Sequence, residues 1–220
     1  MNNHIKNLIL IGTLFFIVSA FVRVYRVSEI SMHYSLMEDD LVVVENISAG
    51  MHIPSWFFYS SGHIFSHEEG IHRGDIMAFK HPLDERLYLK RVTALAGDSV
   101  FQKDKDFYLQ IDTNETKTLK YAQKNNLEVD RFDNEIWLKN PYHRVYHISH
   151  DALVVGPKAL IVYPKTRIAE HHYYFMGDYR DNSTDSRFFG PVSYDDIYYK
   201  VHTVISSSKN LEEKGPIKLF

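Results

Sequence analysis

A long apolar run near the start of the chain allows two alternatives. Residues 8–22 (LILIGTLFFIVSAFV), fifteen in all, carry no charge and lie between Lys6 and the basic residues Arg23 and Arg26. A helix of that length would span about 22 Å. This is short of the ~30 Å hydrocarbon core of a bilayer unless residues up to 25 and the flanking basic side chains extend it. We therefore expect either a membrane anchor over residues 7–25 or a cleavable signal peptide, because residues 18–20 (Val-Ser-Ala) resemble a cleavage site.

Beyond residue 26, the alternation of polar and apolar positions favours strands. Runs rich in β-branched and aromatic residues occur between turn residues. The segment 103–150 differs, because it is rich in Lys, Asp and Asn and contains one helix candidate near residues 119–126. We interpret this segment as a small insert or cap outside the core. The pattern predicts a mainly β fold, with strands at 41–46, 76–80, 87–95, 153–155, 160–163, 173–176 and 197–205.

These patterns also predict the domain organisation. A chain of 220 residues allows one large domain with a small insert. We expect an N-terminal tail, an anchor, a β core in two parts separated by the insert, and a C-terminal tail. The N-terminal tail covers residues 1–6 and the anchor residues 7–25. The β core comprises residues 26–102 and 151–205, the insert residues 103–150, and the C-terminal tail residues 206–220.

Composition excludes several classes of function. The formal net charge of −3 gives no electrostatic argument for nucleic acid binding. The chain has no cysteine, which excludes disulfides, thiol catalysis and thiolate metal sites. His143, His147 and His150 would cluster on a helix, but the neighbouring Val, Tyr and Ile favour a strand. We therefore expect neither a metal nor another cofactor.

Lys90 is the first candidate for chemistry. Alternation along the strand 87–95 places Tyr88, Lys90 and Val92 on one face and Arg91 on the other. Burial among apolar neighbours would lower the pKa of Lys90; a shift from ~10.4 to ~8 costs about 3 kcal/mol. A neutral lysine is a competent general base. On this evidence alone, a lysine that extends to solvent from an edge strand is the simpler interpretation.

A base requires a nucleophile, and Ser31 is the best placed hydroxyl residue. It lies within residues 30–36 (ISMHYSL), shortly after the apolar run. Isolated serines are usually turn residues, and the chain has no Gly-x-Ser-x-Gly elbow. Position alone therefore leaves Ser31 a candidate.

The segment 176–191 (MGDYRDNSTDSRFFGP) is the most distinctive polar stretch. It follows an apolar run and has no aliphatic residue between 177 and 190. Its charges of both signs predict charge-assisted hydrogen bonds that hold the loop rigid, and rigid loops beside a strand often carry catalytic groups. An ordinary solvated turn is the alternative. The charged residues are Asp178, Arg180, Asp181, Asp185 and Arg187.

Three blocks together resemble the bacterial type I signal peptidases, which are Ser–Lys membrane endopeptidases. The first is Ser31-Met32 followed by Leu36. The second comprises residues 73–75 (RGD), 88–92 (YLKRV) and 97–98 (GD). The third, residues 177–187 (GDYRDNSTDSR) with 189–191 (FGP), matches almost residue for residue, whereas 103–172 has no recognisable match.

The resemblance implies roles for the reacting groups. Ser31 would be the nucleophile and Lys90 the general base, which takes the Ser31 proton, returns it to the leaving amine and then activates water. Ser183 would hydrogen-bond the Lys90 amine and orient it. The backbone N–H of Ser31 would donate to the oxyanion, in a shallow apolar cleft that admits small side chains one and three residues before the cut.

Supporting roles follow from the same resemblance. Asp185 would pair with Arg187, with Arg91 as a second candidate partner, and so fix the loop of Ser183. Met32 would support the nucleophile segment.

The chain also departs from the family pattern. Tyr34 and Ser35 stand where the family usually has Pro-Thr, and Tyr179 stands where it usually has Asn. Glu29 stands where members often have a small or hydroxyl residue that assists the oxyanion hole. A carboxylate there would repel an oxyanion and favour the charged lysine, so we expect Glu29 to point away or to pair with a cation.

The resemblance implies a membrane-bound serine endopeptidase that cleaves N-terminal signal peptides from exported preproteins. The apolar N-terminus would then be a retained single-pass anchor in the cytoplasmic (inner) membrane, with the catalytic domain extracytoplasmic. Its partners would be preproteins and membrane lipid, not nucleic acid, and the protein would be monomeric. The alternatives are a specialised maturation protease for a pilin or conjugation protein, and an anchored β-domain that binds a partner without catalysis.

Overall fold

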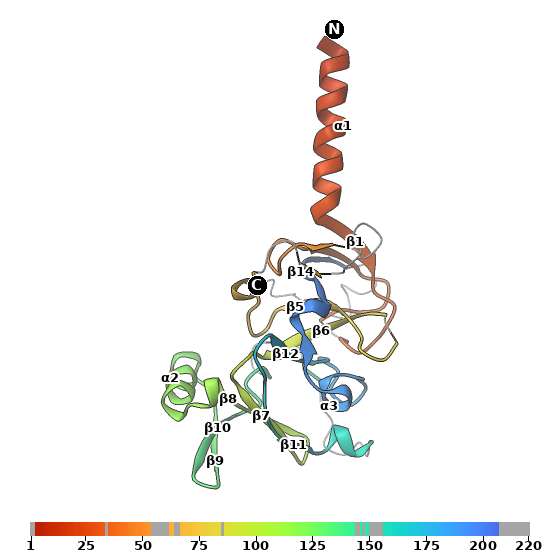
Figure 1. Cartoon of the computed structure of the whole chain (residues 1–220). Coiled ribbons are helices and arrows are strands. Elements are labelled where there is room, and N and C mark those ends of the chain that lie inside the picture. Colours follow the sequence, from red (N-terminus) through yellow and green to blue (C-terminus); the bar gives the residue numbers. More distant parts are fainter. Residues whose placement is uncertain are drawn as a thin grey trace.

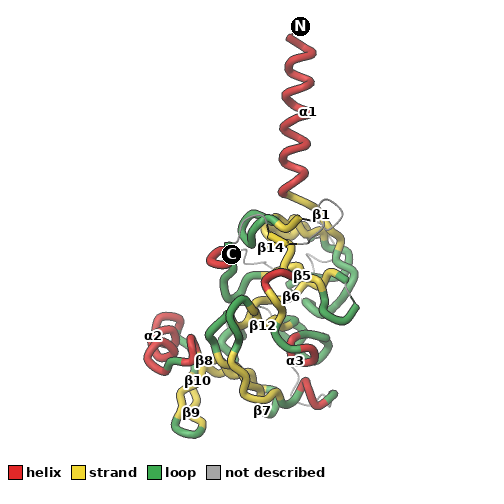
Figure 2. The backbone as a smooth tube through the Cα atoms, viewed as in Figure 1, coloured by secondary structure: helices red, strands yellow, loops and turns green. Residues whose placement is uncertain are grey.

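The computed structural model describes residues 3–33, 35–53, 62–63, 67–84, 86–143, 146, 148–149 and 156–206. A helix, α1 (Asn3–Phe21), extends away from a domain built mainly of strands and loops (Figures 1 and 2). Within the described part of the chain, no helix has both the length and the apolar character needed to cross a bilayer. The strand predicted at 153–155 lies outside the described residues.

The end of the predicted anchor is a strand rather than helix. Helix α1 stops at Phe21, and β1 (Val22–Arg26) begins at the next residue. All five residues of β1 pair with β2 (Leu41–Glu45) in antiparallel register. The β-branched Val22 and Val24 alternate with polar positions, which suits a strand better than a helix. Of the predicted anchor 7–25, residues 22–25 are therefore strand in this structure, and whether the segment enters a membrane stays a prediction.

The main sheet has seven strands in the order β1-β2-β14-β5-β6-β12-β13. Every neighbouring pair is antiparallel. This arrangement confirms the mainly β antiparallel prediction, and β6 lies inside the sheet between β5 and β12. The remaining strands are β5 (Ile76–Lys80), β6 (Leu87–Ala94), β12 (His172–Met176), β13 (Val192–Ser193) and β14 (Ile197–Ile205).

A second sheet has five strands in the order β11-β7-β8-β10-β9. Its strands are β7 (Ser99–Lys103), β8 (Asp106–Gln110), β9 (Val129–Phe132), β10 (Glu135–Lys139) and β11 (Tyr163–Arg167). Helix α2 (Glu115–Asn125) packs against β10. The smaller elements are β3 (His52–Ile53), β4 (Gly62–His63), α3 (Ser186–Phe189) and 3-10 helices at Glu68–Gly70, Ile111–Thr113, Lys158–Leu160 and Tyr194–Asp196.

The second sheet differs from the sequence-based picture of residues 103–150. The segment contains three strands of a regular sheet in addition to the predicted helix, and that sheet also takes in residues before and after it. Near 160–163 the predicted strand was misplaced, because a 3-10 helix covers Lys158–Leu160 and β11 starts at Tyr163.

Three apolar clusters form the core, and one of them positions the residues after β1. Val27, Met32 and Leu36 are buried against Val42 of β2 and Ile76 of β5. Two backbone hydrogen bonds, from Val27 N to Asp40 O and from Asp39 N to Val27 O, join the start of this segment to the residues just before β2. The loop that contains Ser31 is therefore held on the main sheet by its own apolar side chains.

Candidate active site

Ser31 lies in a turn that its two buried neighbours anchor. Met32 is 2% exposed and Leu36 is fully buried, and Leu36 N donates to Met32 O at 2.8 Å. The carbonyl oxygen of Ser31 accepts a hydrogen bond from Tyr179 N at 3.1 Å, which ties the turn to the loop after β12. Met32 is packed in the core directly after Ser31, and its support of the nucleophile segment stays a prediction.

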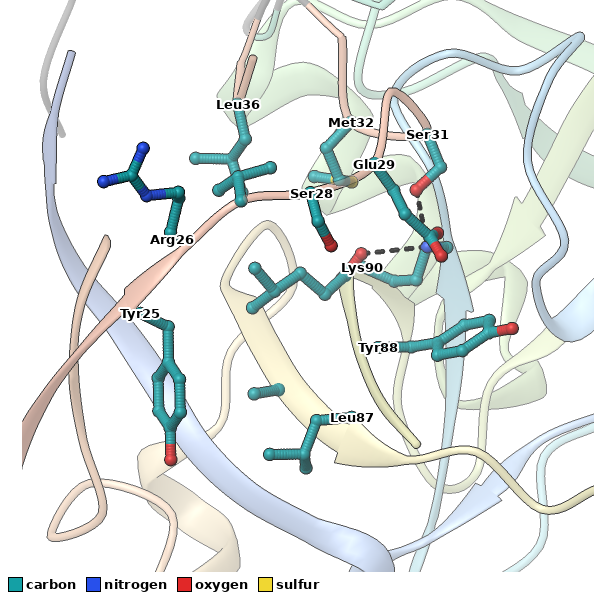
Figure 3. Close-up of a pocket in the computed structure, with 13 residues that line it drawn as sticks. Tyr25, Arg26, Ser28, Glu29, Ser31, Met32, Leu36, Leu87, Tyr88 and Lys90 are labelled. Atoms are coloured by element: carbon teal, nitrogen blue, oxygen red, sulfur yellow. Dashed lines mark hydrogen bonds between the residues drawn. The ribbon is translucent and has the colours of Figure 1, made fainter. Parts of the chain in front are cut away.

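Lys90 meets Ser31 from the middle of β6. Its side chain is 1% exposed, and Nζ donates to Ser31 Oγ at 2.7 Å and to Leu89 O at 3.1 Å (Figure 3). The Tyr88 ring lies 5.0 Å from Nζ. Residues 59 positions apart in the sequence thus form a direct hydroxyl–amine pair.

Burial makes the neutral form of Lys90 more accessible than it is for a lysine in water. Burial lowers the pKa of Lys90 to about 8, while the carboxylates of Asp185 and Glu29 act in the opposite direction. An amine with this pKa is about one-tenth neutral at pH 7. Such a group can accept a proton from a hydroxyl at hydrogen-bonding distance.

The polar loop 176–191 is held by a buried ion pair next to the site. Asp185 accepts two hydrogen bonds from the Arg187 guanidinium, at 2.8 and 2.7 Å, and both residues are buried. It also accepts from Gly177 N at 3.0 Å. Burial alone would raise the pKa of the Asp185 carboxyl, but the charge and hydrogen bonds of Arg187 outweigh it and lower that pKa. The predicted Asp185–Arg187 pair is present.

Ser183 lies next to this pair, and its hydroxyl helps to lower the pKa of Asp185. Ser183 is 6% exposed, and within the described part of the chain the interaction of its Oγ with Asp185 falls outside strict hydrogen-bonding geometry. The predicted hydrogen bond from Ser183 to Lys90 is not formed in this structure, where the Lys90 amine bonds to Ser31 and Leu89.

Gly177 brings the polar loop against the nucleophile turn. A Cβ at this position would lie 2.5 Å from the Ser31 carbonyl oxygen and closer still to Ser183 Oγ. The backbone of one loop and the side chain of another leave no room for it. Glycine is therefore required here by the close approach of two chain segments.

Arg91 lies in the core instead of facing away from it. It is 1% exposed, and its guanidinium donates to Asp178 at 2.8 and 2.6 Å and to Gly74 O at 2.6 Å. The Tyr146 ring lies 3.7 Å from its central carbon. The carboxylate that pairs with Arg91 here is that of Asp178, whereas Asp185 pairs with Arg187. The alternation of residues along 87–95 correctly placed Arg91 and Lys90 on opposite faces of β6. It could not show that residues from other segments cover the face that carries Arg91.

Partners from outside the polar segment complete its network. Asp181 accepts a hydrogen bond from Lys105 Nζ at 2.8 Å. The Arg180 guanidinium is buried; Nη1 approaches the Met176 sulfur at 3.3 Å, and Nε and Nη2 lack a partner within the described ranges. Lys105 gave no sequence signal, since it lies 76 residues away on the turn between β7 and β8.

Two cavities flank the Ser31–Lys90 pair. One, of about 140 Å³, has mostly apolar walls; the other, of about 450 Å³, is more polar. Ser28, Glu29, Ser31, Tyr88 and Lys90 line both. The first is also lined by Tyr25, Arg26, Val27, Met32, Leu36, Ala78, Leu87 and Leu89, and the second by Ile30, Asn182 and Thr184.

Glu29 does not turn away from the pair as expected. It lines both cavities, and Figure 3 shows its side chain beside Ser31 and Lys90. Its charge raises the pKa of Lys90, although burial dominates.

Two of the three histidines considered in the sequence, His147 and His150, lie outside the described residues. Among the residues that the structure describes, no three His, Asp or Glu side chains gather so as to hold a metal ion.

Comparisons with known proteins identify the family of this chain. A family model described as signal peptidase, peptidase S26, matches residues 1–206. Signal peptidase I of Helicobacter pylori strain 26695 is 28% identical, with 96% of this chain and 85% of that protein covered. Signal peptidase I of Buchnera aphidicola subsp. Schizaphis graminum is 26% identical, with 91% and 73% covered.

A solved structure of a signal peptidase I from Enterococcus faecalis is 24% identical and covers 60% of this chain and 97% of its own. Its TM-score of 0.33 supports no comparison of individual elements. The family model, in contrast, spans all but the last fourteen of the 220 residues. The chain therefore belongs to the signal peptidase family, peptidase S26.

Proposed function

We propose that this protein is a serine endopeptidase that removes N-terminal signal peptides from exported preproteins. The observation that carries the proposal is the 2.7 Å contact between Lys90 Nζ and Ser31 Oγ, made by a lysine that is 1% exposed. Membership of the peptidase S26 family supports the same activity.

The geometry suggests how the two residues share the reaction. Neutral Lys90 accepts the Ser31 hydroxyl proton while Oγ attacks the scissile carbonyl carbon and forms a tetrahedral oxyanion. The intermediate collapses as the Lys90 ammonium gives its proton to the leaving amine, which releases the mature protein and leaves an ester on Ser31. Lys90 then deprotonates a water that hydrolyses the ester and restores the free hydroxyl.

Ser183, Asp185 and Arg187 would act as positioning residues. When Ser31 Oγ moves to the substrate carbonyl, the Lys90 amine loses its bond to Ser31. The Ser183 hydroxyl, which in this structure interacts only weakly with Asp185, would then hold the amine. The buried Asp185–Arg187 pair would keep Ser183 in place, and the Arg91–Asp178 pair would fix β6 to the same loop.

We further propose that α1 is a retained single-pass anchor in the cytoplasmic membrane, with the β domain extracytoplasmic. Support comes from the uncharged run 8–22 and from exposed apolar side chains along the helix, including Ile5, Leu8 and Ile9. Mature protein that begins at Phe21, or that partitions into the soluble fraction after alkaline extraction, would overturn this part of the proposal.

The activity is tested with purified full-length protein and several unrelated preproteins, with products identified by mass spectrometry. Ser31→Ala and Lys90→Met should abolish cleavage. Ser48→Ala and Lys117→Met, which change the same residue types away from the site, should retain it. Cleavage that survives both site substitutions would refute the Ser–Lys pair, and an inert wild type would favour a non-catalytic binding domain. Cleavage of one preprotein alone would favour a dedicated maturation protease.

A further inference from the structure

Glu29 is the charged residue at the site for which the proposed reaction has no use. Its side chain is exposed and lines both cavities beside Ser31. Within the described part of the chain, no Lys, Arg or His forms an ion pair with it (the salt bridges there join other residues). Lys90, the nearby cation that its charge influences, is hydrogen-bonded to Ser31 and Leu89.

The two cavities that Glu29 lines suit different parts of a substrate. The scissile carbonyl must lie at Ser31 Oγ, so the residues before and after the cut lie on opposite sides of Ser31. The cavity walled by Val27, Met32 and Leu36 suits the apolar end of the leaving signal peptide. The polar cavity, with Asn182 and Thr184, is left for the first residues of the mature chain.

We propose that Glu29 makes this enzyme prefer preproteins with a Lys or Arg side chain in the first two residues after the cut. The inference rests on the proposed function. In the polar cavity, a substrate cation would meet the Glu29 carboxylate together with the oxygen atoms of Asn182 and Thr184. Glu29 is a specificity-determining residue in this proposal, and Ser31 and Lys90 remain the reacting groups.

The preference should appear in turnover as well as in binding. A lone carboxylate beside Ser31 opposes the negative charge that develops on the oxyanion. A substrate cation next to Glu29 cancels part of that repulsion, and the gain is largest in the transition state, where the oxyanion exists. Basic substrates should therefore show a higher kcat, not only a lower KM.

The test uses one preprotein in three forms, with Lys, Gln or Glu at the first position after the cut, and the full-length enzyme. For wild type we expect kcat/KM to fall in the order Lys, Gln, Glu, by up to about fivefold at each step, the range of an exposed charge pair. The steps should shrink as salt is raised. Glu29→Gln should remove the order, and Glu29→Lys should reverse it.

Glu115→Gln is the matched control. It makes the same change of charge on α2, beyond the second sheet and away from the site (Figure 1), and should preserve the order. Equal rates for the three substrates in wild type, or an order that persists in Glu29→Gln, would overturn the inference while the proposed function stands. Failure of wild type to cleave any of them would remove the proposed function and this inference with it.

Discussion

Replacing Lys90 by methionine should stabilise the protein while abolishing its activity. The substitution keeps an unbranched side chain of similar length but removes the amine. Lys90 is 1% exposed, and burial lowers its pKa from 10.5 to about 8. The folded protein therefore bears a free-energy cost whenever this lysine is charged, and methionine at the same place bears none.

The size and sign of the effect follow from these two pKa values. Their difference corresponds to about 3 kcal/mol. Below pH 8 the lysine is protonated in both states, so the full cost is present. Between about pH 8 and 10.5 the folded protein has released the proton that the unfolded chain still holds, so wild-type stability rises with pH. Lys90→Met should thus be more stable at pH 7 by up to about 3 kcal/mol, and the advantage should vanish near pH 10.5.

Chemical denaturation of both proteins at several pH values between 7 and 10 measures this difference. Over the same range the wild-type cleavage rate should rise through about pH 8, because the base must be neutral. Lys117→Met removes an exposed lysine of α2 and should give a small difference that is the same at pH 7 and 9. A Lys90→Met protein that is no more stable than wild type at pH 7, or whose advantage does not shrink with pH, would refute the burial argument.

Three further substitutions test the surroundings of the site. Asp185→Asn should cost about 3 kcal/mol of stability, because it leaves the Arg187 guanidinium buried without its counter-charge; a loss below 1 kcal/mol by denaturation would contradict this. Gly177→Ala should slow cleavage more than tenfold, because its Cβ meets the Ser31 carbonyl oxygen, and wild-type kinetics would show that the loop can yield. Asn114→Ala should cost about 1 kcal/mol through loss of the α2 N-cap and leave the cleavage rate unchanged, since α2 lies beyond the second sheet; a reduced rate would reveal coupling to the site.

The alternation pattern identified the face of β6 that carries Lys90, but it left an exposed lysine as the simpler interpretation and did not predict the burial of Arg91. Alternation along residues 87–95 depends only on local geometry, and it placed Lys90 among apolar neighbours correctly. Whether the other face of the strand is also covered depends on residues far away in the chain. Here Asp178 and Tyr146 cover it.

The second sheet was missed because its strands are short and lie between strongly polar stretches. Phe101 stacks on Tyr108 and meets the Trp137 ring edge to face, but charged residues separate these aromatic residues along the sequence, which weakens the hydrophobic pattern. The signal that would have found them lies in the turns. Two-residue hairpins with positive φ at both positions join β7 to β8 and β9 to β10, and the second, Asp133-Asn134, has residue types typical of that turn.

The direct junction of α1 and β1 fixes the distance between the end of the helix and the site of cleavage. No linker residue separates Phe21 from Val22, and β1 is paired along its whole length, so about 16 Å of rigid strand carries the chain towards Ser31. The height of the nucleophile above the end of α1 is therefore set by backbone pairing and not by an adjustable tether. If α1 is held in a bilayer, a change in the tilt of α1 would change the orientation of the cleft. Residues inserted between Phe21 and Val22 would let the position of the cleft vary relative to the membrane surface.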